Sequence, residues 1–220
     1  MNVVYALTRN YYERIRPSVR SLLEHNPKAK IYVLAEDDEI GIPATVINVR
    51  NQTAFPRSGP NYGNQFTYIN LLKVCYPSLL PVNKVIHLDV DTIVCDSLEP
   101  LWKTDLKGKW FAAVPEYKGT YRPFGWPYYN AGVMLLNLAQ LRKDNAEEEM
   151  VHYLNTVRQP WADQDAWNRN PEKADAAPIR YNENMMTGET GDPAIVHYCA
   201  VKDWWTSKKV HRREYLERYR

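Results

Sequence analysis

Two aspartates interrupt an otherwise apolar segment, KVIHLDVDTIV at residues 84–94, and their spacing is the first sign of chemistry in the chain. Side chains at positions i and i+2 of a strand share a face. If the strand ends at Leu88, Asp89 and Asp91 point the same way from its carboxyl end, where open α/β sheets bind ligands. Two carboxylates this close repel unless one is protonated. A divalent cation removes the conflict, and oxygen ligation suits Mg²⁺ or Mn²⁺ bridging to a substrate phosphate.

The D-x-D spacing is weak evidence on its own. Slightly less than one such pair is expected by chance from the number of aspartates, and the sequence holds two, the second being Asp163 and Asp165. Strand-end aspartates that cap a turn are the structural alternative for the first pair. Other residues must decide between a ligand site and a turn.

The elements around this pair predict an α/β fold. Apolar runs alternate with a segment of helical spacing in the first fifty residues, and this β-α-β order predicts a parallel sheet covered by helices. The predicted strands are residues 1–7, 30–36, 45–49, 84–88, 109–116 and 131–138, and the predicted helices are 15–23, 68–80 and 146–158, the last capped by Asn145. Residues 50–65 and 116–129 are predicted loops. The second loop holds six aromatic residues, which are typical of pocket walls but equally of a core or an interface.

Composition restricts the class of protein. A chain of 220 residues suits one domain with a sizeable core. The net charge of +2 does not indicate a nucleic-acid partner. Three cysteines without a C-x-x-C spacing argue against a disulfide framework or structural zinc. No run approaches the roughly 20 apolar residues that span a bilayer, so we expect a cytoplasmic protein.

Four blocks in order resemble glycosyltransferase family 8, the retaining enzymes that include lipopolysaccharide galactosyltransferases and glycogenin. The blocks are KVIHLDVDTIV, YYNAGVMLLNLAQLR, ADQDAWN and IVHYCAVKDWW. The resemblance implies a GT-A fold, a Rossmann-like mixed but mostly parallel sheet flanked by helices. It implies one domain over residues 1–220. Residues 1–100 would be mainly the nucleotide and metal half, 101–200 the donor-sugar and acceptor half, and 201–220 a basic aromatic tail.

The resemblance also implies a metal site and a sugar site. Asp89, Asp91 and His197 would hold Mn²⁺, or Mg²⁺. Asn130 would contact the donor sugar, with Asp163 and Gln164 near its anomeric carbon. A glutamine is a poor nucleophile, which favours front-face attack over a covalent intermediate. Each position has a structural alternative: a histidine satisfied by hydrogen bonds, a turn asparagine, and a helix cap at residues 163–165.

The nucleotide-binding positions that the resemblance implies depart from the family pattern in three places. Thr8 stands where the family has a base-reading aspartate, and Asn70 where it has an arginine. The block around Lys202 is one residue short and has Asp203 in place of proline, so the register is open there. The implied positions are Ala6, Thr8, Asn10, Tyr11, Asn70, Asp89, Lys202 (on the diphosphate) and Trp204 (closing a lid).

The resulting hypothesis is a Mn²⁺-dependent retaining hexosyltransferase. Its donor would be a nucleotide sugar, UDP-glucose or UDP-galactose, and its acceptor a carbohydrate or glycolipid. One alternative is a nucleotide-sugar-binding protein with degraded catalysis. Another is a metal-dependent phosphohydrolase or nuclease, which needs a second metal cluster. The basic aromatic tail is either a solvated helix or a peripheral contact with anionic lipid, and the sequence does not indicate an oligomeric state.

Overall fold

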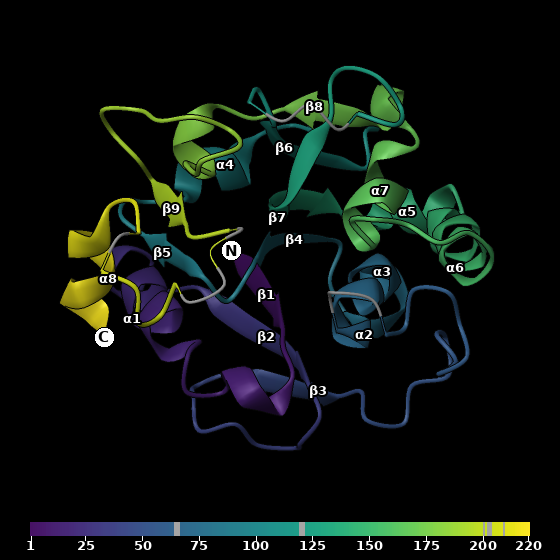
Figure 1. Ribbon diagram of the computed structural model, residues 1–220, viewed down its shortest axis with the longest axis horizontal. Helices are drawn as coiled ribbons and strands as arrows, with labels where there is room; N and C mark the ends of the chain where they lie inside the picture. The colour runs from purple at the N-terminus through teal and green to yellow at the C-terminus, as the bar shows by residue number, and fades with distance from the viewer. Residues whose placement is uncertain (64–66, 119–121, 200, 202–203, 209) are drawn as a thin grey trace.

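A seven-stranded sheet forms the centre of the computed structural model, which describes residues 1–63, 67–118, 122–199, 201, 204–208 and 210–220. Its order is β3-β2-β1-β4-β7-β6-β8 (Figure 1). Only β7 runs against its two neighbours, and the other pairings are parallel. The predicted α/β class and mostly parallel sheet are therefore confirmed. The strands are β1 (Asn2–Ala6), β2 (Lys30–Ala35), β3 (Thr45–Asn48), β4 (Lys84–Leu88), β6 (Phe111–Pro115), β7 (Tyr129–Asn137) and β8 (Ala174–Ala176).

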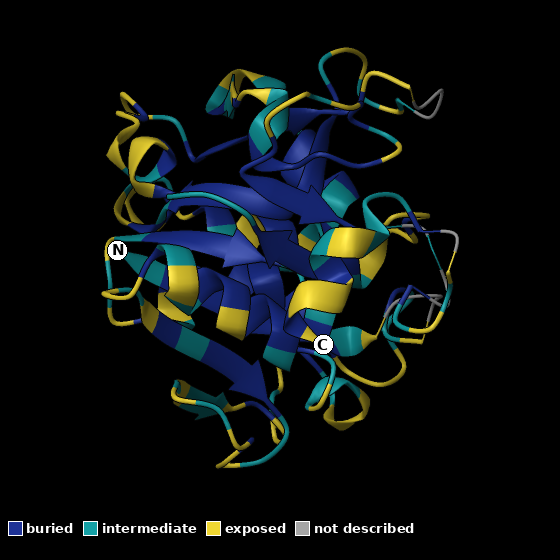
Figure 2. Cartoon of the chain, turned by 90° about the vertical axis from the view of Figure 1, so that its left-hand side faces the viewer, coloured by how far each residue is buried: buried dark blue, intermediate teal, exposed yellow. Residues whose placement is uncertain are grey.

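Helices cover both faces of this sheet, which explains why its strands are nearly continuous apolar runs. Along β1, Val4 joins the core on one face, whereas Val3 and Tyr5 join the core on the other. The central strands are buried, the edge strand β3 is partly exposed, and the outer sides of the helices are exposed (Figure 2). The helices are α1 (Arg16–His25), α2 (Tyr68–Leu71), α3 (Tyr76–Leu79), α4 (Glu99–Lys103), α5 (Leu138–Lys143), α6 (Ala146–Thr156), α7 (Asp163–Asn168) and α8 (Arg213–Tyr219). Short 3-10 turns are η1 (Arg9–Tyr11), η2 (Leu72–Cys75), η3 (Pro171–Lys173) and η4 (Ile179–Tyr181).

Two local predictions were wrong in detail. The single helix predicted at 68–80 is instead α2 and α3 joined by the tighter turn η2, and Pro77 lies in the first turn of α3, where its missing N–H removes no intrahelical bond. Asn145 precedes α6, but its side chain makes no capping hydrogen bond to the helix backbone. Its backbone is left-handed at φ 53°, and its amide bonds the Glu148 side chain instead.

A two-stranded ribbon stands apart from the main sheet. Strand β5 (Thr92–Val94) pairs antiparallel with β9 (Ile195–His197). A third core lies beside it, and Trp204 and Tyr219 of the carboxyl-terminal tail are buried there. Helix α8 packs against α1, and Arg20 donates to the Tyr219 carbonyl at 3.2 Å. The tail is thus docked on the domain by an apolar side. Among the described residues, none of the helices is both long and apolar enough to cross a membrane.

The aromatic loop at residues 116–129 contains both exposed rings, as expected of a pocket wall, and buried rings, as expected of a core. Tyr117 and Trp126 are about half exposed, at 49% and 50%, and their rings lie 5.3 Å apart. Tyr128 and Tyr129 are buried and belong to the interior. Among the described aromatic residues of the loop, the exposed ones are therefore those available to a ligand, and Tyr121 lies outside the described residues.

Candidate functional site

The D-x-D pair sits in a short turn between β4 and β5. The Asp89 N–H donates to the Gly132 carbonyl at 2.8 Å, and the Asp91 carbonyl accepts from the Tyr198 N–H at 2.9 Å. The Thr92 hydroxyl closes the turn by donating to the Asp89 carbonyl at 2.8 Å. Each aspartate is therefore held at its backbone by a different later segment of the chain.

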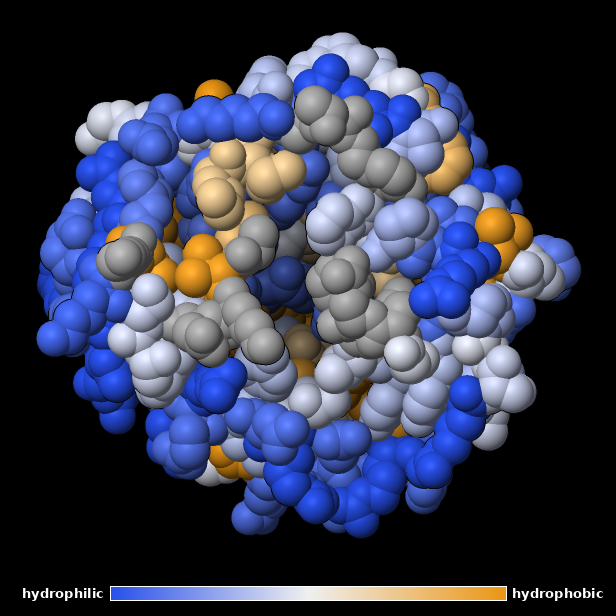
Figure 3. Space-filling view, viewed as in Figure 1, coloured by the Kyte–Doolittle hydropathy of each residue, from blue (hydrophilic) through white to orange (hydrophobic). Residues whose placement is uncertain are grey.

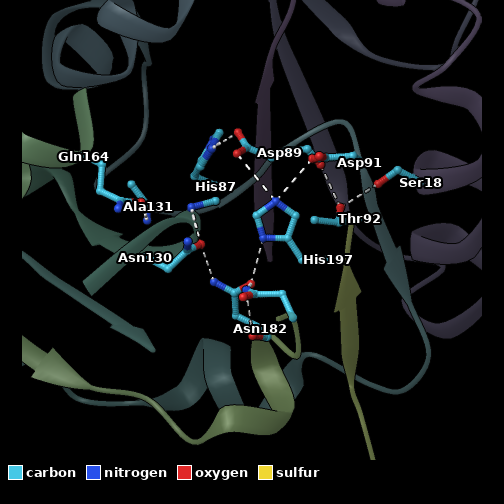
Figure 4. A network of polar contacts seen from close by, with 12 residues as sticks. Ser18, His87, Asp89, Asp91, Thr92, Asn130, Ala131, Gln164, Asn182 and His197 are labelled. Atoms are coloured by element: carbon cyan, nitrogen blue, oxygen red, sulfur yellow. Dashed lines mark hydrogen bonds and ion pairs between the residues drawn. The ribbon is translucent and has the colours of Figure 1, made fainter. Parts of the chain in front are cut away.

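His197 completes a cluster with the two aspartates, as predicted (Figure 4). Its Nε2 lies 3.3 Å from Asp91 Oδ1 and 3.8 Å from Asp89 Oδ2. Neighbouring ligands of an octahedral ion are about 3 Å apart, because each lies about 2.1 Å from the metal. Burial lowers the pKa of His197, but the Asp91 and Asp89 carboxylates outweigh it and raise that pKa above its usual value. Two carboxylates and an imidazole with converging atoms fit a divalent cation, and imidazole suits Mn²⁺ better than Mg²⁺.

Gly132 makes room for this cluster. A Cβ added there would lie 2.1 Å from His197 Cε1, closer than any tolerable contact. The small pair Ala131-Gly132 of β7 thus lets the imidazole pack directly on the strand. The sequence block around Asn130 and the block around His197 are therefore complementary parts of one site.

The inner oxygen of Asp89 is already occupied by two buried side chains. Lys73 Nζ lies 2.7 Å and His87 Nε2 3.0 Å from Asp89 Oδ1. Burial would raise the pKa of Asp89, but Lys73 and His87 outweigh it and hold that pKa well below its usual value. Burial lowers the pKa of His87 to about 4, so the imidazole is neutral and can donate from Nε2 while Nδ1 takes the Tyr76 hydroxyl at 2.9 Å. Asp89 is thereby kept ionised, with Oδ2 turned toward Asp91 and His197.

Lys73 also reaches the second acidic block. Its Nζ lies 3.5 Å from Asp163 Oδ2, and the lysine side chain is only 4% exposed. Burial raises the pKa of Asp163 to about 6, although Lys73 partly opposes the rise. The burial of Lys73 would lower its own pKa, but the Asp163 and Asp89 carboxylates raise it above its usual value. Asp163 Oδ2, the atom that faces Lys73, is buried and accepts no hydrogen bond from the described residues, and other atoms of Asp163 line the cavity.

Asn70, which stands where the family has an arginine, has a lysine nearby in Lys73. The two residues lie three positions apart on the α2–η2 segment, and both line the same cavity. Residues three apart on a helix are neighbours on its surface. The positive charge is therefore present at this wall, one turn farther along the chain.

Another part of the cavity wall is formed by Asn130 on β7 and Gln164 on α7, the residues predicted for the donor sugar. The Gln164 Oε1 accepts from the Ala131 N–H at 2.9 Å, and its Nε2 donates to Glu116 Oε1 at 3.1 Å. Asn130 Nδ2 donates to the same carboxylate oxygen at 2.8 Å. Burial raises the pKa of Glu116, and the two amides oppose the rise. The cavity brings together Asn70, Lys73, Asp89, Glu116, Asn130, Ala131, Gly132, Trp161, Asp163, Gln164, Met186, His197 and Cys199.

Figure 3 shows a hollow near the middle of the molecular face drawn in Figure 1. Asp165, the second aspartate of the other D-x-D, does not line the cavity. Its carboxylate accepts from the Tyr128 hydroxyl at 2.7 Å and from the Trp161 N–H at 2.9 Å. Within the described part of the chain, a single group of three metal-ligating residues is found, that of Asp89, Asp91 and His197. The second metal cluster that a phosphohydrolase would need is not formed there.

Asn70 and Asp89, two of the residues predicted for the nucleotide, line the cavity, whereas four others lie at the carboxyl end of β1, beside β4. Ala6 is buried, Thr8 and Tyr11 are half-buried, and Asn10 is exposed. They are not among the residues that line the cavity. Trp204 is 5% exposed, and its ring stacks on the Tyr198 ring with the two centroids 5.9 Å apart. Tyr198 directly follows His197 in the sequence. Lys202 and Asp203 lie outside the described residues.

Sequence reasoning missed three buried polar residues of the site. Lys73 carried a signal, because a lysine within LLKVCY is surrounded by apolar neighbours and such a residue is buried only when paired. Glu116 lies at the end of a predicted strand and Asn182 in an irregular segment, and neither position differs in pattern from an ordinary polar residue. Their roles depend on contacts that only the fold creates.

A mostly parallel α/β sheet with a D-x-D turn at its carboxyl edge, a completing histidine and adjoining amide side chains is the arrangement of a GT-A glycosyltransferase. The solved structure of the galactosyltransferase LgtC in complex with donor and acceptor sugar analogues superposes with a TM-score of 0.72, at 22% identity, over 100% of this chain and 94% of that one.

Comparison with protein families gives the family directly. Residues 2–208 match the model of glycosyl transferase family 8, and the chain belongs to that family. Glycosyltransferase GlyA of Streptococcus pneumoniae serotype 4 is 24% identical over 92% of this chain, which spans only 32% of GlyA. General stress protein A of Bacillus subtilis is 22% identical over 98% of this chain and 92% of its own length.

Proposed function

We propose that this chain transfers a hexose from a nucleotide sugar to a carbohydrate or glycolipid acceptor, with retention of configuration at the anomeric carbon. The donor we propose is UDP-glucose or UDP-galactose, bound with Mn²⁺ at Asp89, Asp91 and His197. The observation that carries the proposal is the convergence of these three ligand atoms at the edge of the cavity that Asn130, Asp163 and Gln164 line.

The residues of this chain divide the work between the two ends of a donor. A bound cation would supply positive charge where the diphosphate leaves, which is the part of the reaction that most needs stabilisation. Asp89 presents Oδ2 to that end because Lys73 and His87 hold its other oxygen. At the sugar end, Asp163 lines the cavity beside Asn130 and Gln164, where its carboxyl group would lie next to the ring.

The state of Gln164 supports front-face attack. Its amide is fixed on both sides, by the Ala131 N–H and by Glu116. A neutral amide held in this way positions a sugar and stabilises developing positive charge, but it is a poor nucleophile. In the front-face route the oxygen of the departing phosphate takes the acceptor's proton, so the protein does not need a carboxylate nucleophile beneath the ring.

Nucleotide-sugar binding without turnover is the alternative, since Thr8 and Asn70 depart from the family pattern. The position of Lys73 at the cavity wall weighs against it, because the positive charge is retained. The acceptor end is open to a carbohydrate through the exposed ring of Trp126, and the basic residues of the tail could face an anionic lipid surface.

The proposal is tested by incubating the chain with UDP-, GDP- and ADP-linked hexoses, with Mn²⁺, with Mg²⁺ and with EDTA. Release of nucleoside diphosphate and the anomeric configuration of the product, read by proton NMR, give the donor and the stereochemistry. A donor at 100 times its Kd would raise the melting temperature by about 5–10 °C. The proposal fails if no nucleotide sugar is turned over or shifts melting, and melting shifts without turnover support the binding protein.

A further inference from the structure

A continuous line of hydrogen bonds connects the metal-site histidine to the sugar end of the cavity (Figure 4). His197 Nδ1 lies 2.9 Å from Asn182 Oδ1, and Asn182 Nδ2 lies 2.8 Å from Asn130 Oδ1. Asn130 Nδ2 then lies 2.8 Å from Glu116 Oε1. All four side chains are buried, with exposures of 0 to 7%.

Which group donates and which accepts in each of these hydrogen bonds is determined at Glu116, the end farthest from His197. A carboxylate accepts hydrogen bonds, so the Asn130 group that faces Glu116 must be its NH₂. The Gly132 backbone N–H, 3.1 Å from Asn130 Oδ1, requires the same orientation independently. Asn130 therefore turns an acceptor toward Asn182, and Asn182 must donate from Nδ2 and turn its own oxygen toward His197.

Asn182 is itself held in that orientation. Asn184 Nδ2 donates to Asn182 Oδ1 at 2.9 Å, which again requires an oxygen on the His197 side. The Asn182 backbone carbonyl accepts the Thr187 hydroxyl at 2.5 Å, and its N–H donates to the Ile179 carbonyl at 2.9 Å. The amide facing His197 Nδ1 can therefore only accept a hydrogen bond.

We propose that Asn182 is a positioning residue that holds the neutral imidazole of His197 in the Nδ1–H form. The lone pair is then on Nε2, the atom that faces Asp89 and Asp91. Ligand histidines commonly have their other nitrogen fixed by such a partner, and loss of the partner weakens metal binding by about 10–100-fold. This inference rests on the metal site of the proposed function, but it concerns the state of the ring before any metal or donor is bound.

The same line has a consequence at the sugar end. Asn130 Oδ1 already accepts from Gly132 and Asn182, and one hydrogen of its Nδ2 goes to Glu116. The group that Asn130 has left for a ligand is the second hydrogen of Nδ2. Asn130 thus offers a donor to a sugar oxygen, and this polarity depends on the same contacts that set the tautomer of His197.

The first experiment reads the tautomer directly. Long-range proton–nitrogen NMR of the metal-free chain labelled with ¹⁵N-histidine, in alkaline buffer so that the ring is neutral, is expected to show a larger share of the His197 proton on Nδ1 in the wild type than in Asn182→Leu. The comparison is needed because Asp89 and Asp91 beside Nε2 favour the other form in both proteins. The His197→Gln spectrum assigns the signal among the five histidines. An equal Nδ1 share in the wild type and in Asn182→Leu would overturn the inference, whether or not the chain transfers sugar.

The second experiment measures Mn²⁺ affinity by electron paramagnetic resonance of the free ion. Asn182→Leu, which removes the acceptor, is expected to weaken binding about 10–100-fold. Asn182→Asp keeps an acceptor for Nδ1 but cannot donate to Asn130, so Mn²⁺ affinity should stay at or above that of the wild type while KM for the donor rises. Equal loss of affinity in both variants would refute the inference.

Asn61→Leu is the matched control. Asn61 is also a buried amide, with bonds to the Leu154 and Val157 carbonyls, and it lies outside the cavity. It should lower the melting temperature without changing Mn²⁺ affinity. If Asn61→Leu weakens Mn²⁺ as much as Asn182→Leu does, the effect is global and the inference is wrong. If the wild type binds no Mn²⁺, the proposed metal site fails, and the NMR result still decides the tautomer.

Discussion

The spacing D-x-D occurs twice in this chain, and the two copies lie in different backbone structures with different side-chain contacts. Asp89 and Asp91 lie in an extended turn after β4, and both carboxylates converge on His197. Asp163 and Asp165 begin helix α7, where residues two apart point in different directions. Asp163 faces the cavity, whereas Asp165 bonds Tyr128 and the Trp161 backbone. Lys73 connects the two copies by touching one carboxylate of each. The D-x-D spacing therefore brings two carboxylates together only where the backbone that carries them is extended rather than helical.

The largest effect is expected when the same substitution is made in each copy. Asp91→Asn removes one proposed metal ligand, and since the cation contributes several kcal/mol to leaving-group stabilisation, kcat/KM should fall about 1,000-fold or more. Asp165→Asn should leave kcat/KM within about threefold, because its carboxylate is outside the cavity. Initial rates of nucleoside diphosphate release measure both. Similar losses in the two variants would erase the distinction between the copies.

Replacing Lys73, whose ammonium group contacts one carboxylate of each D-x-D copy, should lower the stability of the fold. Lys73→Met leaves Asp89 and Asp163 buried without their partner, so the free energy of unfolding should fall by about 3–5 kcal/mol. Urea unfolding in EDTA at neutral pH measures it. Lys173→Met is the control, because its pair with Asp144 is partly exposed and is worth about 0–1 kcal/mol. Equal changes for the two lysines would show that burial at Lys73 is unimportant.

The pH dependence should distinguish Asp163 from Asp89. The folded-state pKa of Asp163 is raised from 3.8 to about 6, so its contribution to stability is fully present below pH 4 and is lost as pH rises through 6. By this shift the wild type should lose about 3 kcal/mol relative to Asp163→Asn between pH 4 and pH 7. Asp89, whose pKa is lowered, destabilises both proteins at acid pH, and because it shares Lys73 with Asp163 its contribution cancels only in part. Metal-free urea unfolding at a series of pH values measures it, and a difference independent of pH would contradict the assignment.

The smallest effect concerns the structural role of Asp165. Tyr128→Phe leaves one Asp165 oxygen without its hydroxyl partner inside the protein, which should lower the free energy of unfolding by about 1–2 kcal/mol. Mn²⁺ affinity should not change. A variant with altered Mn²⁺ affinity but unchanged stability would show that Asp165 belongs to the ligand site after all.

The sequence was sufficient for the fold class and for the expectation that Asp89, Asp91 and His197 lie together, because these depend on strong local patterns and on the order of blocks. It was insufficient where tertiary contacts override local preference. Asn145 has the composition of a helix cap but adopts a left-handed backbone, and residues 68–79 form tight turns under the packing of Tyr76 and Cys75 in the core. The departure at Asn70 was visible in the sequence, but its compensation by Lys73 required knowing that both face one cavity.

The pairing of β5 with β9 has a consequence for the timing of folding. The seven-stranded sheet uses residues only as far as Ala176, whereas His197 arrives on a separate ribbon paired with Thr92. During synthesis, the main sheet could therefore assemble while the histidine is still inside the ribosome. Contacts between segments so distant in the chain form late and slowly. Capture of a cation by all three ligands would then mark the moment at which the last fifth of the chain has joined the rest.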